Sequence, residues 1–145
     1  HTGKLVVHKR WASKVARVFH KLYDARFPIR RMRLVDRYGA IDMRSMKADN
    51  TSAFNCRYRN NVCCTWSQHA YGRAIDINPV ENPWRKPQRI VPDAGRAFAD
   101  RTAIRPGMIV RPGPVVAALD ELGWEWGGDW RHAYDDHHIV WSRPL

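Results

Sequence analysis

The segment from Ser67 to Asp76 constrains the fold and chemistry of this chain more than any other segment. It reads Ser-Gln-His-Ala-Tyr-Gly-Arg-Ala-Ile-Asp and places an imidazole, His69, and a carboxylate, Asp76, seven positions apart. The segment between them contains one glycine and two alanines, whose small size keeps bulky side chains away from the two polar groups. Gly72 also lets the backbone turn sharply between these groups.

The end of this segment has the pattern of a strand. Within Arg73–Asn78, Ile75 and Ile77 alternate with Asp76 and Asn78, so that one face is apolar and the other polar. We therefore expect the isoleucines to face a core and Asp76 to face a cleft. A nitrogen ligand from a turn and an oxygen ligand from a strand would supply half of a zinc site.

The length and composition of the chain predict a single domain spanning residues 1–145. The 145 residues are 44% hydrophobic, which is enough to form a core. No apolar run approaches the length of a membrane span. The first residues, beginning His1-Thr2-Gly3, lack the pattern of a signal peptide, which is compatible with a mature or a truncated form.

The chain is strongly basic, with 25 Lys and Arg residues against 14 Asp and Glu residues and a formal charge of +11. Such a surface attracts polyanions, so nucleic acid and an anionic cell envelope are both candidate partners beside the simple case of a basic soluble protein. The sequence shows no zinc finger, helix-turn-helix or RNP motif. We therefore do not expect nucleic-acid binding from the charge alone.

Three cysteines, Cys56, Cys63 and Cys64, lie close together in the sequence. They form no Cys-x-x-Cys pair, which argues against a zinc site built from cysteines. A disulfide from Cys56 to Cys63 or Cys64 is expected if the protein is exported, and three reduced thiols are the alternative.

Hydrophobic periodicity predicts two main helices. The first extends from Trp11 to Arg26, and the second from Pro114 to Leu122, with proline at its start and Gly123 after its end. Further expected elements are a strand or lead-in at 5–8, strands at 29–35 and 138–141, and a short helix at 94–101. Since strands and helices do not alternate regularly, the fold class is α+β.

The C-terminal segment Asp135-Asp136-His137-His138 is the obvious source of a third metal ligand. Strand alternation places His137 and His138 on opposite faces, but it does not say which face is the core. Either histidine therefore fits the pattern at this point.

Taken together, the motifs resemble those of the M15 family of zinc peptidases. The resemblance rests on Ser67-x-His69-x-x-Gly72-x-Ala74-x-Asp76, then Trp126-Gly127-Gly128-Asp129-Trp130, then Asp135-x-x-His138. The family includes D-alanyl-D-alanine carboxypeptidases of the VanY type and L-alanyl-D-glutamate endopeptidases of lysins. It implies a hedgehog/D-Ala-D-Ala-peptidase-like fold with a small, mainly antiparallel sheet and flanking helices.

The resemblance implies zinc (Zn2+) as cofactor and a role for each matching residue. The metal ligands would be His69, Asp76 and His138. Asp135 would be the catalytic acid–base, with Asp136 as its neighbouring competitor. The family usually has an aromatic residue after the last ligand, where this chain has Ile139.

Three further residues are expected to contact the substrate. Arg57 is the best match to the family arginine that assists the carbonyl oxygen, and Arg59 lies nearby. Ser67 would either orient the first ligand or cap a turn. Trp126 would contact substrate, or else form part of the core and cleft wall.

These expectations define a zinc-dependent peptidase that hydrolyses peptide-stem bonds of bacterial peptidoglycan, of the D-Ala-D-Ala carboxypeptidase or the L-Ala-D-Glu endopeptidase type. We expect a monomer, secreted or acting at the cell wall, whose basic surface suits an anionic envelope. The alternative from another class is a non-catalytic, zinc-stabilised module that binds a polyanion or the cell wall.

Overall fold

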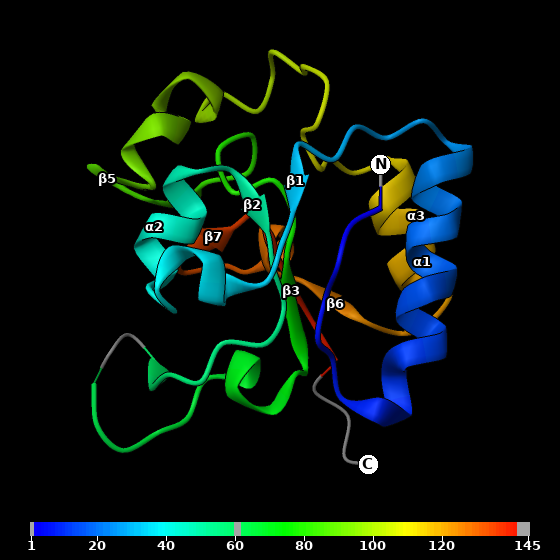
Figure 1. Ribbon diagram of the computed structural model, residues 1–145. Coiled ribbons are helices and arrows are strands. Elements are labelled where there is room, and N and C mark those ends of the chain that lie inside the picture. Colours follow the sequence, from blue (N-terminus) through cyan, green and yellow to red (C-terminus); the bar gives the residue numbers. More distant parts are fainter. Residues whose placement is uncertain (1, 60–61, 142–145) are drawn as a thin grey trace.

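The computed structural model describes residues 2–59 and 62–141, and it has the expected α+β fold (Figure 1). The helices in this part of the chain are α1 (Ala12–Asp24), α2 (Asp42–Lys47) and α3 (Pro114–Asp120), joined by 3-10 turns that include η1 (Lys9–Trp11), η2 (Val35–Tyr38), η4 (Gln68–Tyr71), η5 (Asp93–Phe98) and η6 (Gly127–Asp129). None of the described helices has the length and apolar character needed to cross a membrane.

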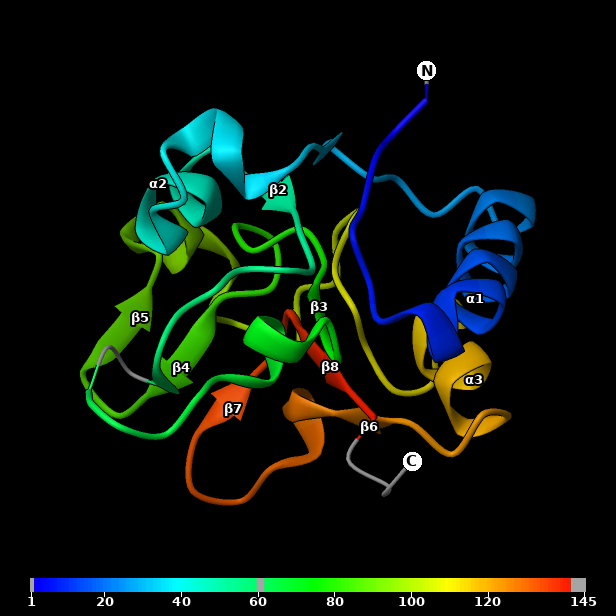
Figure 2. The same ribbon diagram turned by 60° about the horizontal axis from the view of Figure 1, so that its bottom comes forward.

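The described strands form three small sheets. The central sheet has the antiparallel order β3 (Ala74–Asp76), β8 (His138–Val140), β6 (Glu125–Trp126), which Figure 2 shows at the middle of the molecule. A second antiparallel sheet has the order β5 (Arg89–Val91), β4 (Trp84–Lys86), β7 (Tyr134–Asp135). A short parallel pair joins β1 (Arg31–Met32) to β2 (Asn50–Thr51).

Helices α1 and α3 lie side by side against one flank of the central sheet (Figures 1 and 2). The apolar positions of α1 recur at helical spacing, and Val15, Val18 and Leu22 are buried. The helix ends shortly before Phe27 and Pro28, because the residue before a proline avoids the helical region. Both predicted helices are thus confirmed, each slightly shorter than expected.

The register of the central sheet decides which side chains meet. Asp76 pairs with His138, and Ile75 pairs with Ile139. Side chains directly opposite each other on antiparallel strands share one face of the sheet. The isoleucines enter the hydrophobic core as expected, whereas Asp76 is itself only 2% exposed. The polar face of β3 is therefore buried rather than open to a cleft.

The strand expected at 29–35 is limited to β1, because the Asn50 side chain occupies backbone hydrogen-bonding groups of Arg33. The amide of Asn50 accepts from the Arg33 backbone nitrogen at 2.9 Å and donates to the Arg33 carbonyl oxygen at 3.0 Å. These are the groups that a longer ladder would use.

The segment at 5–8 is an extended lead-in without a strand ladder. Its backbone groups bond to separate segments, since Val6 pairs with Phe54 and His8 with Gly72. The expected helix at 94–101 is the 3-10 turn η5. Helix α2 was not anticipated, because its region is polar and lacks helical periodicity.

The cysteine pairing differs from the expectation. Cys63 is joined to its neighbour Cys64, and Cys56 is a free, exposed thiol. The predicted disulfide to Cys56 was therefore wrong.

Two carboxyl groups, Asp49 and Glu81, are buried beside β2 and near the second sheet. Arg30 lies on their outer side, with its Nε 3.4 Å from Glu81 and 3.9 Å from Asp49. The Arg30 side chain is largely exposed, so solvent screens its charge. Burial, and after it the neighbouring Asp49, raises the pKa of Glu81 to about 7.

This pair predicts a pH-dependent loss of stability. Because the pKa of Glu81 is higher in the folded state than in the unfolded chain, the folded state binds more protons between about pH 4.5 and 7, and stability falls as pH rises through that window. Glu81→Gln should remove this loss. Its free energy of unfolding relative to the unmodified protein should therefore rise from pH 4.5 to 7 and then level off, as measured by urea titration at several pH values. A difference that does not change with pH would contradict this account.

Candidate metal centre and active site

Three side chains with metal-binding atoms converge between η4 and the central sheet. His69 comes from η4, Asp76 from β3 and His138 from β8, and their ligand atoms all lie within 4.8 Å of one another. His69 Nε2 lies 3.2 Å from Asp76 Oδ2 and 3.3 Å from His138 Nδ1. His138 Nδ1 lies 2.9 Å from Asp76 Oδ1.

The spacing of these atoms fits a tetrahedral zinc ion. Zinc binds imidazole nitrogen and carboxylate oxygen at roughly 2.0–2.2 Å, and two ligands of a regular tetrahedron are then about 3.3–3.6 Å apart. The observed separations of 2.9–3.3 Å are close to this edge length. The three residues therefore fit the metal without a rearrangement of the backbone.

The backbone fixes which nitrogen of His69 is available. His69 Nδ1 lies 2.6 Å from the carbonyl oxygen of Ala53, and because a carbonyl only accepts, Nδ1 carries the proton. In the neutral ring, Nε2 then presents a lone pair toward the carboxylate of Asp76. Two lone pairs this close repel unless a proton or a metal ion lies between them, so the arrangement suits a cation at this point.

The charges at the centre support one another. Burial favours the neutral form of Asp76, yet His69 and His137 outweigh it and hold the pKa of Asp76 well below its usual range. Burial likewise opposes a charge on His69, but Asp76 raises the pKa of His69. Asp76 therefore stays ionised, as a metal ligand must.

Asp135, at the end of β7, lies beside this centre without belonging to the three converging ligands. Its side chain is 17% exposed, and its Oδ1 is 2.9 Å from Nε2 of buried His137. A Cβ on Gly127 would lie 2.5 Å from the Asp135 carbonyl oxygen, so a glycine is needed for this close approach. Asp135 is thus held near the ligands, partly open to solvent.

His137 contacts Asp135 and is not one of the converging ligands. Its Nδ1 lies 2.7 Å from the carbonyl oxygen of Asn82, so Nδ1 is the donor, and Nε2 faces Asp135. Burial opposes its charge, but Asp135 and Asp76 raise the pKa of His137 to about 10. His137 is therefore a cation that steadies two carboxylates, a role that the sequence did not indicate.

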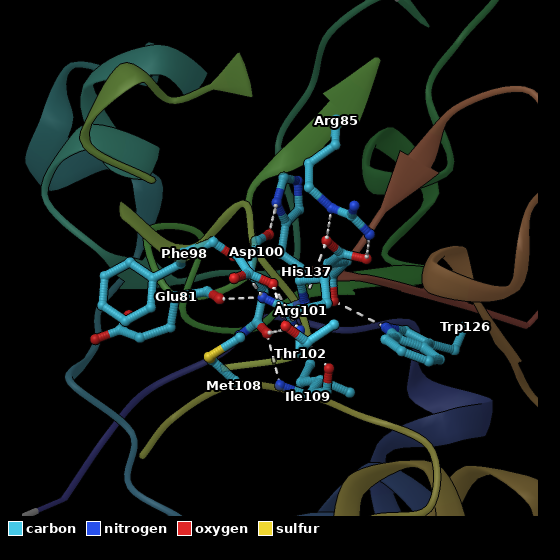
Figure 3. Close-up of polar contacts among 12 residues, drawn as sticks. Glu81, Arg85, Phe98, Asp100, Arg101, Thr102, Met108, Ile109, Trp126 and His137 are labelled. Atoms are coloured by element: carbon cyan, nitrogen blue, oxygen red, sulfur yellow. Dashed lines mark hydrogen bonds and ion pairs between the residues drawn. The ribbon is translucent and has the colours of Figure 1, made fainter. Parts of the chain in front are cut away.

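Asp136 belongs to a separate network with Arg85, Arg101 and Trp126, and Figure 3 labels these three residues. Its carboxylate accepts hydrogen bonds from Nε and Nη2 of Arg85 and has Arg101 3.7 Å away. Trp126 Nε1 donates to the Asp136 backbone oxygen at 2.8 Å. The carboxylate of Asp136 is thus engaged by two arginines, which leaves Asp135 as the acid near the ligands.

Comparison with known proteins agrees with this geometry. A family model described as D-alanyl-D-alanine carboxypeptidase, of the M15 peptidases, matches residues 63–141, more than half of the chain. The chain belongs to this family. No curated protein and no solved structure matches it.

Membership of the M15 family supports a peptidase that acts on D-Ala-D-Ala-type substrates. M15 peptidases generally depend on zinc, and the His69, Asp76 and His138 group can hold a metal. These three residues and Asp135 lie inside the matched segment. Arg57 lies outside it, so its role rests on geometry and on the motif resemblance alone.

Arg57 lies close enough to act electrostatically on the first ligand. Besides burial, its positive charge opposes protonation of His69 and so works to lower the pKa of that ring. Its side chain is 21% exposed, and Nη2 lies 3.1 Å from Asp42 Oδ2. Among the described residues, no group accepts a hydrogen bond from its buried Nε.

The other two residues expected to contact substrate are buried. Ser67 is 6% exposed, and its hydroxyl accepts from the His69 backbone nitrogen at 3.3 Å, which caps η4 and orients the first ligand. Trp126 is 8% exposed and packs in the hydrophobic core. The structure brings neither side chain to an open surface of the site.

Substitution of the three converging residues should abolish metal binding. His69→Ala, Asp76→Ala and His138→Ala should each lower zinc affinity by more than about 100-fold, because removal of a ligand exceeds the 10–100-fold effect of an outer partner. His137→Gln should retain zinc, as should the control His20→Ala on the exposed side of α1. Zinc content after dialysis against a weak chelator, measured by mass spectrometry, is the test. Zinc lost from His137→Gln but kept by His138→Ala would exchange the two assignments.

Proposed function

We propose that this chain is a zinc-dependent peptidase that cleaves the peptide stems of bacterial peptidoglycan. The observation that carries the proposal is the convergence of His69, Asp76 and His138 with a second, partly exposed carboxylate, Asp135, at their side. A purely structural zinc site uses its four protein ligands and needs no additional acid. Three ligands with a neighbouring acid are typical of a hydrolytic site.

His69, Asp76 and His138 would hold the zinc. When bound, zinc supplies a Lewis acid and lowers the pKa of water to about 7, which provides a nucleophile near neutral pH. Burial of His69 and Asp76, with the contact between His69 Nδ1 and the Ala53 carbonyl oxygen, keeps these two ligands oriented for this task.

Asp135 would act as the general base and then as the general acid. Its carboxylate accepts a proton from the attacking water and returns it to the amine that leaves when the peptide bond breaks. His137 holds Asp135 in place and stabilises its negative charge. General acid–base groups of this kind contribute roughly 10²–10⁴-fold to the rate.

Arg57 would stabilise the carbonyl oxygen of the scissile bond as that oxygen gains negative charge. Its guanidinium has five N–H donors and contacts Asp42 through Nη2, so other donors remain for the substrate oxygen. A donor placed in advance costs little reorganisation during the reaction, and removal of one such donor typically lowers kcat by about 10²–10³-fold.

The family description favours the terminal D-Ala-D-Ala bond as the site of cleavage. The internal L-Ala-D-Glu bond is the other candidate within the same chemistry. The net charge of +11 suits an anionic cell envelope, so we place the enzyme outside the cytoplasm, at the cell wall.

The competing proposal is a non-catalytic module that uses zinc only for stability and binds a polyanion. Asp135 distinguishes the two, because a binding module needs no acid beside the metal. Such a module would bind wall polymers in a strongly salt-dependent way and release no product.

The decisive experiment combines product identification with an Asp135 variant. Incubation of the zinc-loaded protein with a synthetic stem pentapeptide should release free D-alanine, detected by mass spectrometry, and removal of zinc by a chelator should stop it. Asp135→Asn should retain zinc but lose at least about 100-fold in kcat. Asp93→Asn, an exposed acid on η5, is the matched control and should be fully active.

Other outcomes have clear meanings. Release of L-alanine and the remaining tetrapeptide, instead of D-alanine, would move the cleavage to the L-Ala-D-Glu bond. Activity that survives complete removal of zinc, or an Asp135→Asn variant as active as the unmodified protein, would refute the proposed mechanism.

A further inference from the structure

We infer that Asp42 is a positioning residue that holds Arg57 in place for catalysis. The inference rests on the proposed function, because it assigns Asp42 a part in the peptidase reaction through Arg57. Asp42 lies 21 positions before residue 63, where the segment matched to the family model begins, and carries no motif of its own.

The contact between the two side chains is close and shielded. Asp42 is the first residue of α2, and its Oδ2 lies 3.1 Å from Arg57 Nη2, with both side chains 21% exposed. Its other oxygen, Oδ1, accepts from Asn55 Nδ2 at 3.2 Å. One carboxylate therefore ties Arg57 and its near neighbour Asn55 to the start of a helix.

The backbone that carries Arg57 is attached to the segment of the first metal ligand. The Asn55 backbone nitrogen donates to the His69 carbonyl oxygen at 3.2 Å, and the Ser67 nitrogen donates to the Arg57 carbonyl oxygen at 3.1 Å. These bonds set where the Arg57 side chain begins. They do not set where its guanidinium ends, because an arginine side chain has several rotatable bonds.

Asp42 supplies the missing constraint. A guanidinium beside a divalent metal is repelled by it, whereas the ligand carboxylate of Asp76 attracts it. The ion pair with Asp42 offsets the repulsion and gives the guanidinium a fixed partner other than the reacting groups. The contact with Asp42 is through Nη2, so the guanidinium keeps other N–H groups with which to donate to the substrate.

A purely structural role for Asp42 has a different signature. An acid in the first turn stabilises a helix through the helix dipole, and its loss would lower stability without a selective effect on kcat. Positioning of Arg57 predicts a fall in kcat that depends on the presence of Arg57, with zinc content unchanged.

The test is a double-mutant cycle on the zinc-loaded protein with the stem pentapeptide as substrate. Asp42→Asn keeps the size of the side chain and an oxygen for Asn55, and it should lower kcat about tenfold with KM changed less than twofold. Arg57→Ala should lose about 10²–10³-fold, as expected for an oxyanion donor. The double variant should be no worse than Arg57→Ala alone, because Asp42 acts through Arg57.

Two further variants separate charge from structure. Asp42→Glu restores the negative charge and should recover a large part of kcat. Asp120→Asn breaks the exposed ion pair of Arg111 with Asp120 and is the control, which should leave kcat unchanged. Multiplicative losses in the double variant, or full activity of Asp42→Asn, would overturn the inference.

A measurement independent of activity keeps this inference separate from the proposed function. In nitrogen-15 NMR spectra of arginine side chains, Arg57 should show slow rotation of its guanidinium in the unmodified protein and fast rotation in Asp42→Asn. If the protein fails to cleave stem peptides but Arg57 behaves in this way, the proposed function fails while the restraint stands. Equal, fast rotation in both proteins would overturn the restraint itself.

Discussion

The buried carboxylate of Asp76 is the constraint on which the rest of the structure depends. An isolated ionised carboxylate in a protein interior is very costly, and Asp76 is 2% exposed on a strand whose neighbours are core isoleucines. It is tolerated because His69, His138 and His137 surround it. The pairing of β3 with β8 is therefore as much an electrostatic requirement as a matter of strand geometry.

The groups around Asp76 are in turn held by the backbone and by a second layer of charges. The carbonyl oxygen of Ala53 accepts from Nδ1 of His69, and that of Asn82 accepts from Nδ1 of His137. Each bond sets the direction of Nε2 in the same ring. Arg85 and Arg101, both labelled in Figure 3, hold Asp136, whereas Asp135 contacts His137. Removing one layer would leave the next with buried, unpaired groups.

The sequence predicted the features that local residue patterns determine. The spacing from His69 to Asp76, the alternation of Ile75 with Ile77 and the periodicity of both main helices predicted the fold class and the candidate ligands. The choice between His137 and His138 needed the register of β3 against β8, which two segments about sixty residues apart set together. The short length of β1 depends on the hydrogen bonds between the Asn50 side chain and the Arg33 backbone. Hydrophobic periodicity predicts neither these bonds nor the disulfide between Cys63 and Cys64.

In the proposed zinc peptidase, the positive groups beside the metal would face an electrostatic conflict. A catalytic centre with a divalent metal gains from nearby positive groups that steady the acid and the oxyanion, yet each of them is repelled by the metal. Here each cationic group is paired with its own carboxylate, His137 with Asp135 and Arg57 with Asp42. The pairs are nearly neutral as units, so they can approach the centre while keeping a directed donor or acceptor. These ion pairs explain why the positions of Asp135 and Asp42, which are not metal ligands, matter as much as those of the ligands.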